Sequence, residues 1–213
     1  MRRNQMIPTL LLTAVVAACG GGEDMAEHEA DQEAEMAAAP ATETAAGCFL
    51  QGATIEEAGE RPSPLHTTEL SVGGTEGTLC YGAPSARDRE VMGGLVPYGE
   101  LWRTGANEAT AIHLEGPAVI GGIELDAGSY SLYTMPNEGE WEVFLNSSVE
   151  RWGIPISDEV RETEIGSFTV TPEATDGMVE TLDFSFESSG EASAELVMEW
   201  ENTRIRIPVE AGM

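Results

Sequence analysis

The sequence contains no lysine, and its ten basic residues are all arginine. Aspartate and glutamate together number 38, so the formal net charge is −28 at pH 7. Such a surface repels polyanions, which excludes nucleic acid as a partner. The acids are scattered, and the D-x-D-x-D-G spacing of calcium loops does not occur. We therefore interpret the charge chiefly as a means of solubility, with calcium or cationic ligands as the alternative.

An apolar run long enough to cross a bilayer is also missing. The N-terminal stretch MIPTLLLTAVVAA (6–18) has 13 residues, where about 20 are needed. Its basic start and the small residues at its end are typical of an export signal. The ending VAAC resembles the lipobox of bacterial lipoproteins, which implies removal of residues 1–18 and acylation of Cys19. An ordinary secretory signal is the alternative.

The residue after the lipobox cysteine bears on the destination of the protein. Gly20 follows Cys19, where an aspartate would favour retention in the inner membrane. We therefore expect an exported outer-membrane lipoprotein that faces the periplasm or the cell surface. Its first partner would be the lipid bilayer, through the acylated Cys19. Loss of Arg2 and Arg3 with the leader would lower the formal charge by two, to −30.

Cysteine is scarce, with three residues in the chain. If Cys19 carries lipid, Cys48 and Cys80 remain as an even pair in an oxidising compartment. A disulfide across their separation of 32 residues would stabilise the domain by about 3–4 kcal/mol. Two buried free thiols are the alternative.

Residues 20–47 contain no aromatic residue and no isoleucine, leucine or valine, but they include eight acids. A segment of this composition cannot bury enough apolar surface to offset the entropy of ordering. We interpret residues 19–47 as a lipidated, acidic, disordered tether. The remaining residues, 48–213, are enough for a single domain.

Apolar and polar residues alternate along much of this domain. In ETLDFSFE (180–187), for example, Leu182, Phe184 and Phe186 share one face. Such alternation is typical of antiparallel strands with one wet face. We predict an all-β fold, an antiparallel β-sandwich or flattened barrel of roughly nine strands with little helix. A short helix is expected in SDEVRET after Pro155, with Ser157 as its N-cap. Strands are expected near 67–72, 77–81, 109–114, 129–135, 140–146, 165–171, 180–187, 194–200 and 204–209.

An unusual cluster of residue types occurs in GLVPYGELWRTGANEAT (94–110). Arg103 follows a probable strand and precedes a turn, in which Gly105 permits a positive φ and Asn107 tolerates one. In one interpretation Arg103 is a structural clamp, covered by Trp102 and paired with a carboxylate. The candidate carboxylates are Glu100, Glu108 and Glu199.

In the second interpretation the same residues bind a ligand. Arg103, Asn107 and Glu108 would line a cleft that accepts a sugar or a small acid. An aromatic platform would come from Tyr81, Tyr98 or Trp152, and Trp102 is a further candidate for ligand binding. Arg87 and Arg89 could extend the cleft, although solvated loop arginines are the simpler interpretation.

The segments around this cluster resemble a bacterial domain-of-unknown-function family, numbered 2911. The resemblance rests on GGLVPYG, WRTGANEAT, AGSYSLYTMPNEGEWEVFLN, RWG and MEWENTRIRIPV, and it runs from about Arg61 to Val209. It implies an exported protein but carries over no activity. Ala83 stands where the family pattern has arginine, and Asp88 where it has glycine. If that arginine binds a ligand in the family, binding here is altered.

No pattern in the domain indicates a catalytic or metal centre. There is no G-x-S-x-G, H-E-x-x-H or C-x-x-C, and His113 is expected on the outer face of a strand. We therefore expect no metal and no cofactor. The favoured function is a non-catalytic module, either structural or binding a small molecule or an envelope glycan. A carboxylate-based hydrolase acting on glycans is the alternative, because two acids suffice for that chemistry.

Overall fold

The computed structural model describes residues 47–213. The expected leader (1–18), the lipidation site Cys19 and the tether up to residue 46 lie outside the described residues. In the part described, none of the helices has the length and apolar character needed to span a membrane.

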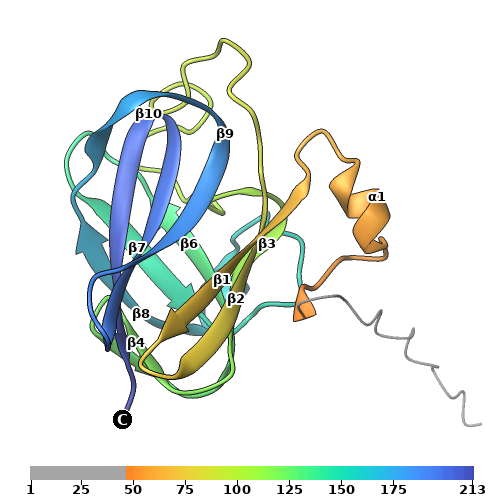
Figure 1. Cartoon of the computed structure of the whole chain (residues 1–213). Helices are drawn as coiled ribbons and strands as arrows, with labels where there is room; N and C mark the ends of the chain where they lie inside the picture. The colour runs from red at the N-terminus through yellow and green to blue at the C-terminus, as the bar shows by residue number, and fades with distance from the viewer. Residues whose placement is uncertain (1–46) are drawn as a thin grey trace, which may run out of the picture. The chain divides into compact units, whose positions relative to one another are not determined.

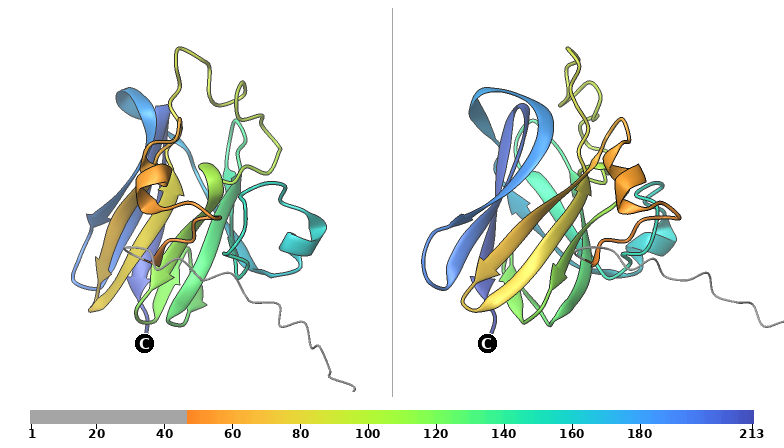
Figure 2. Two further views of the ribbon diagram at one scale, coloured as in Figure 1. Left: turned by 90° about the vertical axis from the view of Figure 1, so that its right-hand side faces the viewer. Right: turned by 45° about the vertical axis from the view of Figure 1, so that its right-hand side comes forward.

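The described chain folds into two antiparallel sheets, which Figures 1 and 2 show as separate layers. The larger sheet has the strand order β1-β2-β3-β6-β7-β8. Every neighbouring pair within it is antiparallel. Its strands are β1 (Leu65–Val72), β2 (Thr75–Gly82), β3 (Ala106–Leu114), β6 (Gly128–Met135), β7 (Trp141–Asn146) and β8 (Glu164–Val170).

The smaller sheet has the order β5-β4-β10-β9 and is also antiparallel. Two short helices complete the structure, α1 (Ile55–Gly59) and α2 (Asp158–Arg161). The strands of the smaller sheet are β4 (Ala118–Ile120), β5 (Ile123–Leu125), β9 (Glu173–Ser188) and β10 (Ser193–Ala211). The predicted antiparallel sandwich is therefore confirmed, with ten strands within residues 47–213 instead of nine.

The core lies where the inward faces of the two sheets meet. The alternation in the sequence identified these faces, since Leu182 and Phe184 of β9 are buried and Phe186 packs against the same cluster. Burial of these apolar side chains, at about 25 cal/mol per Å², provides the main stabilisation of the sandwich. The largest fully buried side chains include Trp141, Trp200, Leu79, Ile112, Leu196, Met198, Ile205 and Ile207.

Three elements differ from the expectation. The segments expected at 194–200 and 204–209 form one continuous strand, β10, because a bulge at Glu201 (φ 56°) bends it without ending it. The hairpin β4–β5 was not expected, since each strand has three residues around Gly121 and Gly122. Helix α1 was also missed, although Thr54 and Glu57 form a complete capping box.

The expectation of one wet face fails for part of the larger sheet. On β7, Phe144 and Asn146 point away from the sandwich core, yet both are buried. The connection that contains α2 covers them, and Figure 2 shows this connection on the side of the larger sheet that faces away from β9 and β10. Asn146 donates to the carbonyl of Val160 in α2, and Ser157 is the N-cap of this helix, as expected. The covered outer face is where the candidate site lies.

Candidate functional site

The backbone at the start of β3 is irregular, and this irregularity shapes the site. Thr104 (φ 53°) and Asn107 (φ 63°) both have left-handed conformations, as expected for Asn107. The expectation for Gly105 is wrong, because its φ is not in the positive region. Gly105 is required for space instead, since a Cβ there would lie 2.6 Å from Oγ1 of Thr110. The Thr110 hydroxyl donates to the carbonyl of Thr104, which fixes the turn.

The carboxylate in this region belongs to Glu108, and its partner is Arg61. Nη1 of Arg61 lies 2.7 Å from Oε2 of Glu108, and the backbone N–H of Gln51 donates to Oε1 at 3.0 Å. The side chain of Arg61 is 21% exposed and that of Glu108 is 10% exposed. A charge-assisted pair in this degree of burial fixes the geometry of both residues. It joins the N-terminal segment to β3 across 47 positions of sequence.

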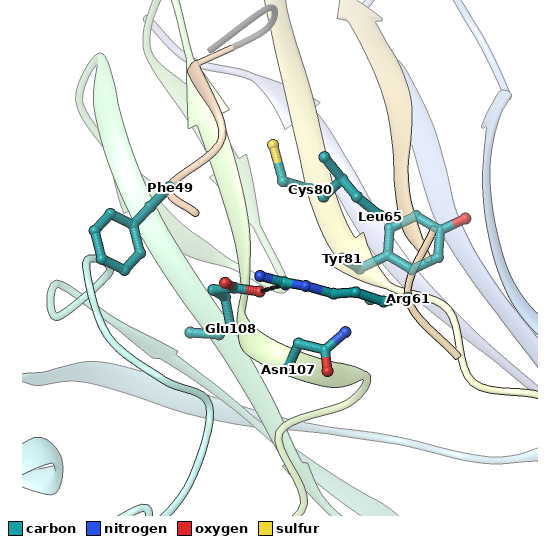
Figure 3. A pocket seen from close by; sticks show the side chains of 9 residues that line it. Phe49, Arg61, Leu65, Cys80, Tyr81, Asn107 and Glu108 are labelled. Atoms are coloured by element: carbon teal, nitrogen blue, oxygen red, sulfur yellow. Dashed lines mark hydrogen bonds and ion pairs between the residues drawn. The ribbon is translucent and has the colours of Figure 1, made fainter. Parts of the chain in front are cut away.

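A small pocket surrounds this pair, as Figure 3 shows. Four segments form it: the N-terminal segment, the first residue of β1, the end of β2 and the start of β3. It has room for about one water molecule, so a ligand would rest in its mouth. The residues that line it are Phe49, Arg61, Leu65, Cys80, Tyr81, Gly82, Asn107, Glu108 and Ala109.

Several polar groups of the pocket have no hydrogen-bond partner among residues 47–213. Asn107 donates through Nδ2 to the carbonyl of Ser63 at 2.7 Å, while its Oδ1 accepts no hydrogen bond. Nη2 and Nε of Arg61 donate none, since only Nη1 contacts Glu108. The residues that line the pocket therefore keep one acceptor oxygen and two donor nitrogens that no described residue uses.

Trp152 extends this site beyond the pocket. It forms a β-bridge with Glu108, and the guanidinium of Arg61 lies 5.9 Å from the centroid of its ring. Its exposed fraction is 39%, so part of the indole is open to solvent. An aromatic surface beside polar donors is a usual arrangement for binding sugars and other polar small molecules.

Arg103 does not form the predicted clamp. Within residues 47–213 it has no ion pair: Glu108 pairs with Arg61, Glu199 pairs with Arg204, and Glu100 is exposed on a loop. Its Nε is buried without a hydrogen-bond partner, and burial lowers the pKa of its guanidinium. The side chain packs against Gly153, beside Trp152.

The other predicted aromatic residues are divided between the core and the surface. Trp102 stacks on Trp200 at 5.8 Å inside the core and covers no arginine at the site. Tyr81 is 2% exposed, and its hydroxyl accepts from the N–H of Phe184, so it forms a wall of the pocket but no open platform. Tyr98 is 41% exposed on the loop between β2 and β3, and it is not among the pocket residues.

The loop arginines Arg87 and Arg89 and the strand residue His113 lie outside the pocket. Arg87 and Arg89 donate to backbone carbonyls of their own neighbourhood, those of Pro62, Ser85 and Ala86, and they do not extend the pocket. His113 lies on the outer face of β3, where Nδ1 is 2.7 Å from Oγ of Ser129. Its Nε2 is buried without a partner, and burial lowers the pKa of the imidazole.

Sequence reasoning missed Arg61, Phe49 and Leu65. A signal for Arg61 does exist, because it is the first basic residue after Arg3 in an otherwise acidic stretch. The structure also joins Cys48 and Cys80 by a disulfide, which holds Phe49 at the pocket wall. In the described chain, no three histidine, cysteine or acidic side chains lie together as metal ligands.

Comparison with known proteins gives a match at the level of the family. A family model described as "protein of unknown function (DUF2911)" matches residues 63–209. No curated protein and no solved structure matches the chain. The structure shows where the two departures from the family pattern lie. Ala83 is fully buried. Asp88 has a left-handed φ of 57°, a conformation that glycine adopts without strain.

Proposed function

Since the chain belongs to the DUF2911 family of proteins of unknown function, we propose from its own geometry that it is a non-catalytic binding module. Its ligand would be a small polar molecule such as an envelope glycan, bound at the mouth of the pocket around Arg61, Asn107 and Glu108. The N-terminal sequence supports an exported protein, held at the outer membrane through acylated Cys19. The ligand would then be a component of the envelope or of the surrounding medium.

The observation that carries this proposal is the arrangement beside Trp152. An indole that is 39% exposed adjoins the guanidinium of Arg61, and Arg61 has donors that no described residue uses. Asn107, another residue of the pocket lining, adds Oδ1 as an acceptor that no described residue uses. A sugar presents an apolar ring face together with hydroxyl groups that both donate and accept, so it complements all three features.

The alternative of a carboxylate-based hydrolase has less support at this site. Glycoside hydrolysis requires two carboxyl groups on opposite sides of the scissile bond. Glu108 is the single carboxylate among the residues that line the pocket, and both of its oxygens already accept hydrogen bonds. An oxygen so engaged is poorly available to protonate a leaving group or to attack a sugar.

Fluorescence titration with neutral disaccharides such as cellobiose, maltose and diacetylchitobiose would test the proposal. We expect a saturable change in tryptophan emission for at least one sugar, because ligand contact would shield the exposed indole of Trp152. The change should disappear in Trp152→Leu and persist in Tyr98→Leu, which removes an equally exposed aromatic residue away from the pocket. Absence of a response to every sugar, or its survival in Trp152→Leu, would contradict the proposal. A reducing-sugar assay on the same mixtures would detect hydrolysis.

A further inference from the structure

The side chain of Arg103 has donors that the described protein leaves unused. Its Nε is shielded from solvent and has no acceptor among residues 47–213. Nη1 and Nη2 also make no hydrogen bond to these residues, but they are not sealed from solvent as Nε is. A buried donor without an acceptor is destabilising, and an ionised one more so. The guanidinium therefore presents one shielded and two accessible donors with no internal partner.

This side chain is nevertheless held in a defined position. Trp102 and Thr134 exchange backbone hydrogen bonds, which fixes the strand segment that carries Arg103. The other side of Arg103 is closed by Gly153, whose N–H donates to the carbonyl of Asn107. A Cβ at position 153 would overlap Cδ of Arg103, so only glycine leaves room for the arginine there. The backbone around Trp102 and the backbone around Gly153 thus together hold the Arg103 side chain in place.

The charges around Arg103 favour an anion. The chain has 38 acids for ten arginines, yet the described part places no carboxylate against Arg103. A second half-buried arginine, Arg151, donates through Nη1 to the carbonyls of Trp152 and Gly153 and through its other nitrogens to Ser148 and Ser131. Cδ of Arg103 packs against the same segment at Gly153, so two arginines lie there without an ion pair to an acid among residues 47–213. An acidic group of a ligand would supply the missing charge and the missing acceptors.

We propose that Arg103 binds a carboxylate end-on, with Nη1 and Nη2, the two nitrogens that are not shielded from solvent, each donating to one of its oxygens. The planar guanidinium fork matches a carboxylate in this geometry, which a lysine could not reproduce. The inference deepens the proposed function, on which it rests: because Gly153 adjoins Trp152, the ligand of that site would be an acidic sugar or another small organic acid. The carboxylate could come from a free ligand or from the eight acids of residues 20–47.

The Nε–H group of Arg103 gives a readout by NMR, because its shielding from solvent slows proton exchange. In the whole ¹⁵N-labelled chain, we expect sodium acetate and sodium glucuronate, bound at Nη1 and Nη2 of the same guanidinium, to move this signal in a saturable manner. The Nε–H signal of Arg204, which already donates to Glu199, should stay unchanged. Sodium chloride at equal ionic strength and neutral glucose should leave both signals in place. Arg103→Lys, which keeps the charge, should remove the signal and identify it.

Affinity for glucuronate provides the second measurement. Loss of a bidentate charge-assisted contact should weaken binding roughly tenfold or more in Arg103→Gln. Gly153→Ala should weaken it as well, because the added methyl group would overlap Cδ of Arg103 and crowd the backbone carbonyls of Asn107 and Glu108. Tighter binding of inorganic phosphate than of acetate would overturn the assignment to a carboxylate. So would an Nε–H signal that responds neither to the added acids nor to replacement of the acids of residues 20–47 by amides, or one that is lost to exchange with water, since loss would show the group to be open to solvent.

The same spectra distinguish the two sources of the carboxylate. If the Arg103 signal does not respond to added acetate but shifts when the acids of residues 20–47 are replaced by amides, the chain supplies its own ligand and the carboxylate assignment holds. The experiment is also independent of the sugar titration. Acetate has no sugar ring, so it reports on Arg103 even if neutral sugars fail to bind at Trp152.

Discussion

Removal of the Glu108 charge should destabilise the domain, because Glu108 holds two segments that are distant in sequence. Glu108→Gln keeps the shape of the side chain and an acceptor for the N–H of Gln51, but it leaves Arg61 without its counter-ion. Breaking a fully buried pair costs about 3–5 kcal/mol. Arg61 retains 21% of its side-chain exposure, so water recovers part of this loss and we expect about 2–3 kcal/mol. For a domain of this size, Tm should fall by roughly 4–12 °C.

The assay is thermal unfolding followed by circular dichroism, in matched buffer and salt. Glu100→Gln is the matched control, since it removes the same charge from an exposed loop residue and should change Tm by about 1 °C or less. Arg103→Gln provides a contrast: its guanidinium has no internal acceptor, so Tm should stay unchanged or rise. A decrease for Glu108→Gln no larger than that of Glu100→Gln would refute the reasoning. A large decrease for Arg103→Gln would show that this arginine stabilises the fold.

Two further predictions concern the disulfide and the buried tyrosines. Reduction of the bond between Cys48 and Cys80 should lower the free energy of unfolding by about 3–4 kcal/mol, as measured by denaturant titration with and without reductant. An unchanged denaturation midpoint would contradict this. Burial raises the pKa of Tyr81 and of Tyr133 to about 12, so both stay neutral in the folded protein after they would ionise in the unfolded chain. Their stabilisation is complete below about pH 10 and is lost as the pH rises toward 12, so unfolding and phenolate absorbance should appear together in an alkaline titration. Phenolate absorbance from these two residues well below pH 12, with the fold intact, would contradict this.

Local alternation of apolar and polar residues predicted most of the fold. It placed the inward faces of β7, β9 and β10 correctly, because side chains on a strand alternate between two faces whatever the partner strand is. The N-cap of α2 at Ser157 was equally predictable from local hydrogen bonding. The same reasoning missed β4 and β5, since three residues are too few to show a period.

The candidate site depended on contacts that local patterns do not encode. Glu108 could have paired with any of several arginines, and its actual partners, Arg61 and Gln51, lie 47 and 57 positions away. Trp102 and Trp152 are the same residue type, yet Trp102 stacks on Trp200 in the core and Trp152 lies at the surface. Only the packing of the covering segments on the larger sheet separates these roles.

The sequence by itself determined the all-β architecture, the faces that form the core and the residue types available for a site. The tertiary structure decided which arginine is paired with Glu108 and which, Arg103, is left with unused donors. The physical reason is that strand alternation and helix capping arise from the geometry of a few consecutive residues. The surroundings of a charged side chain depend instead on segments brought together from distant parts of the chain.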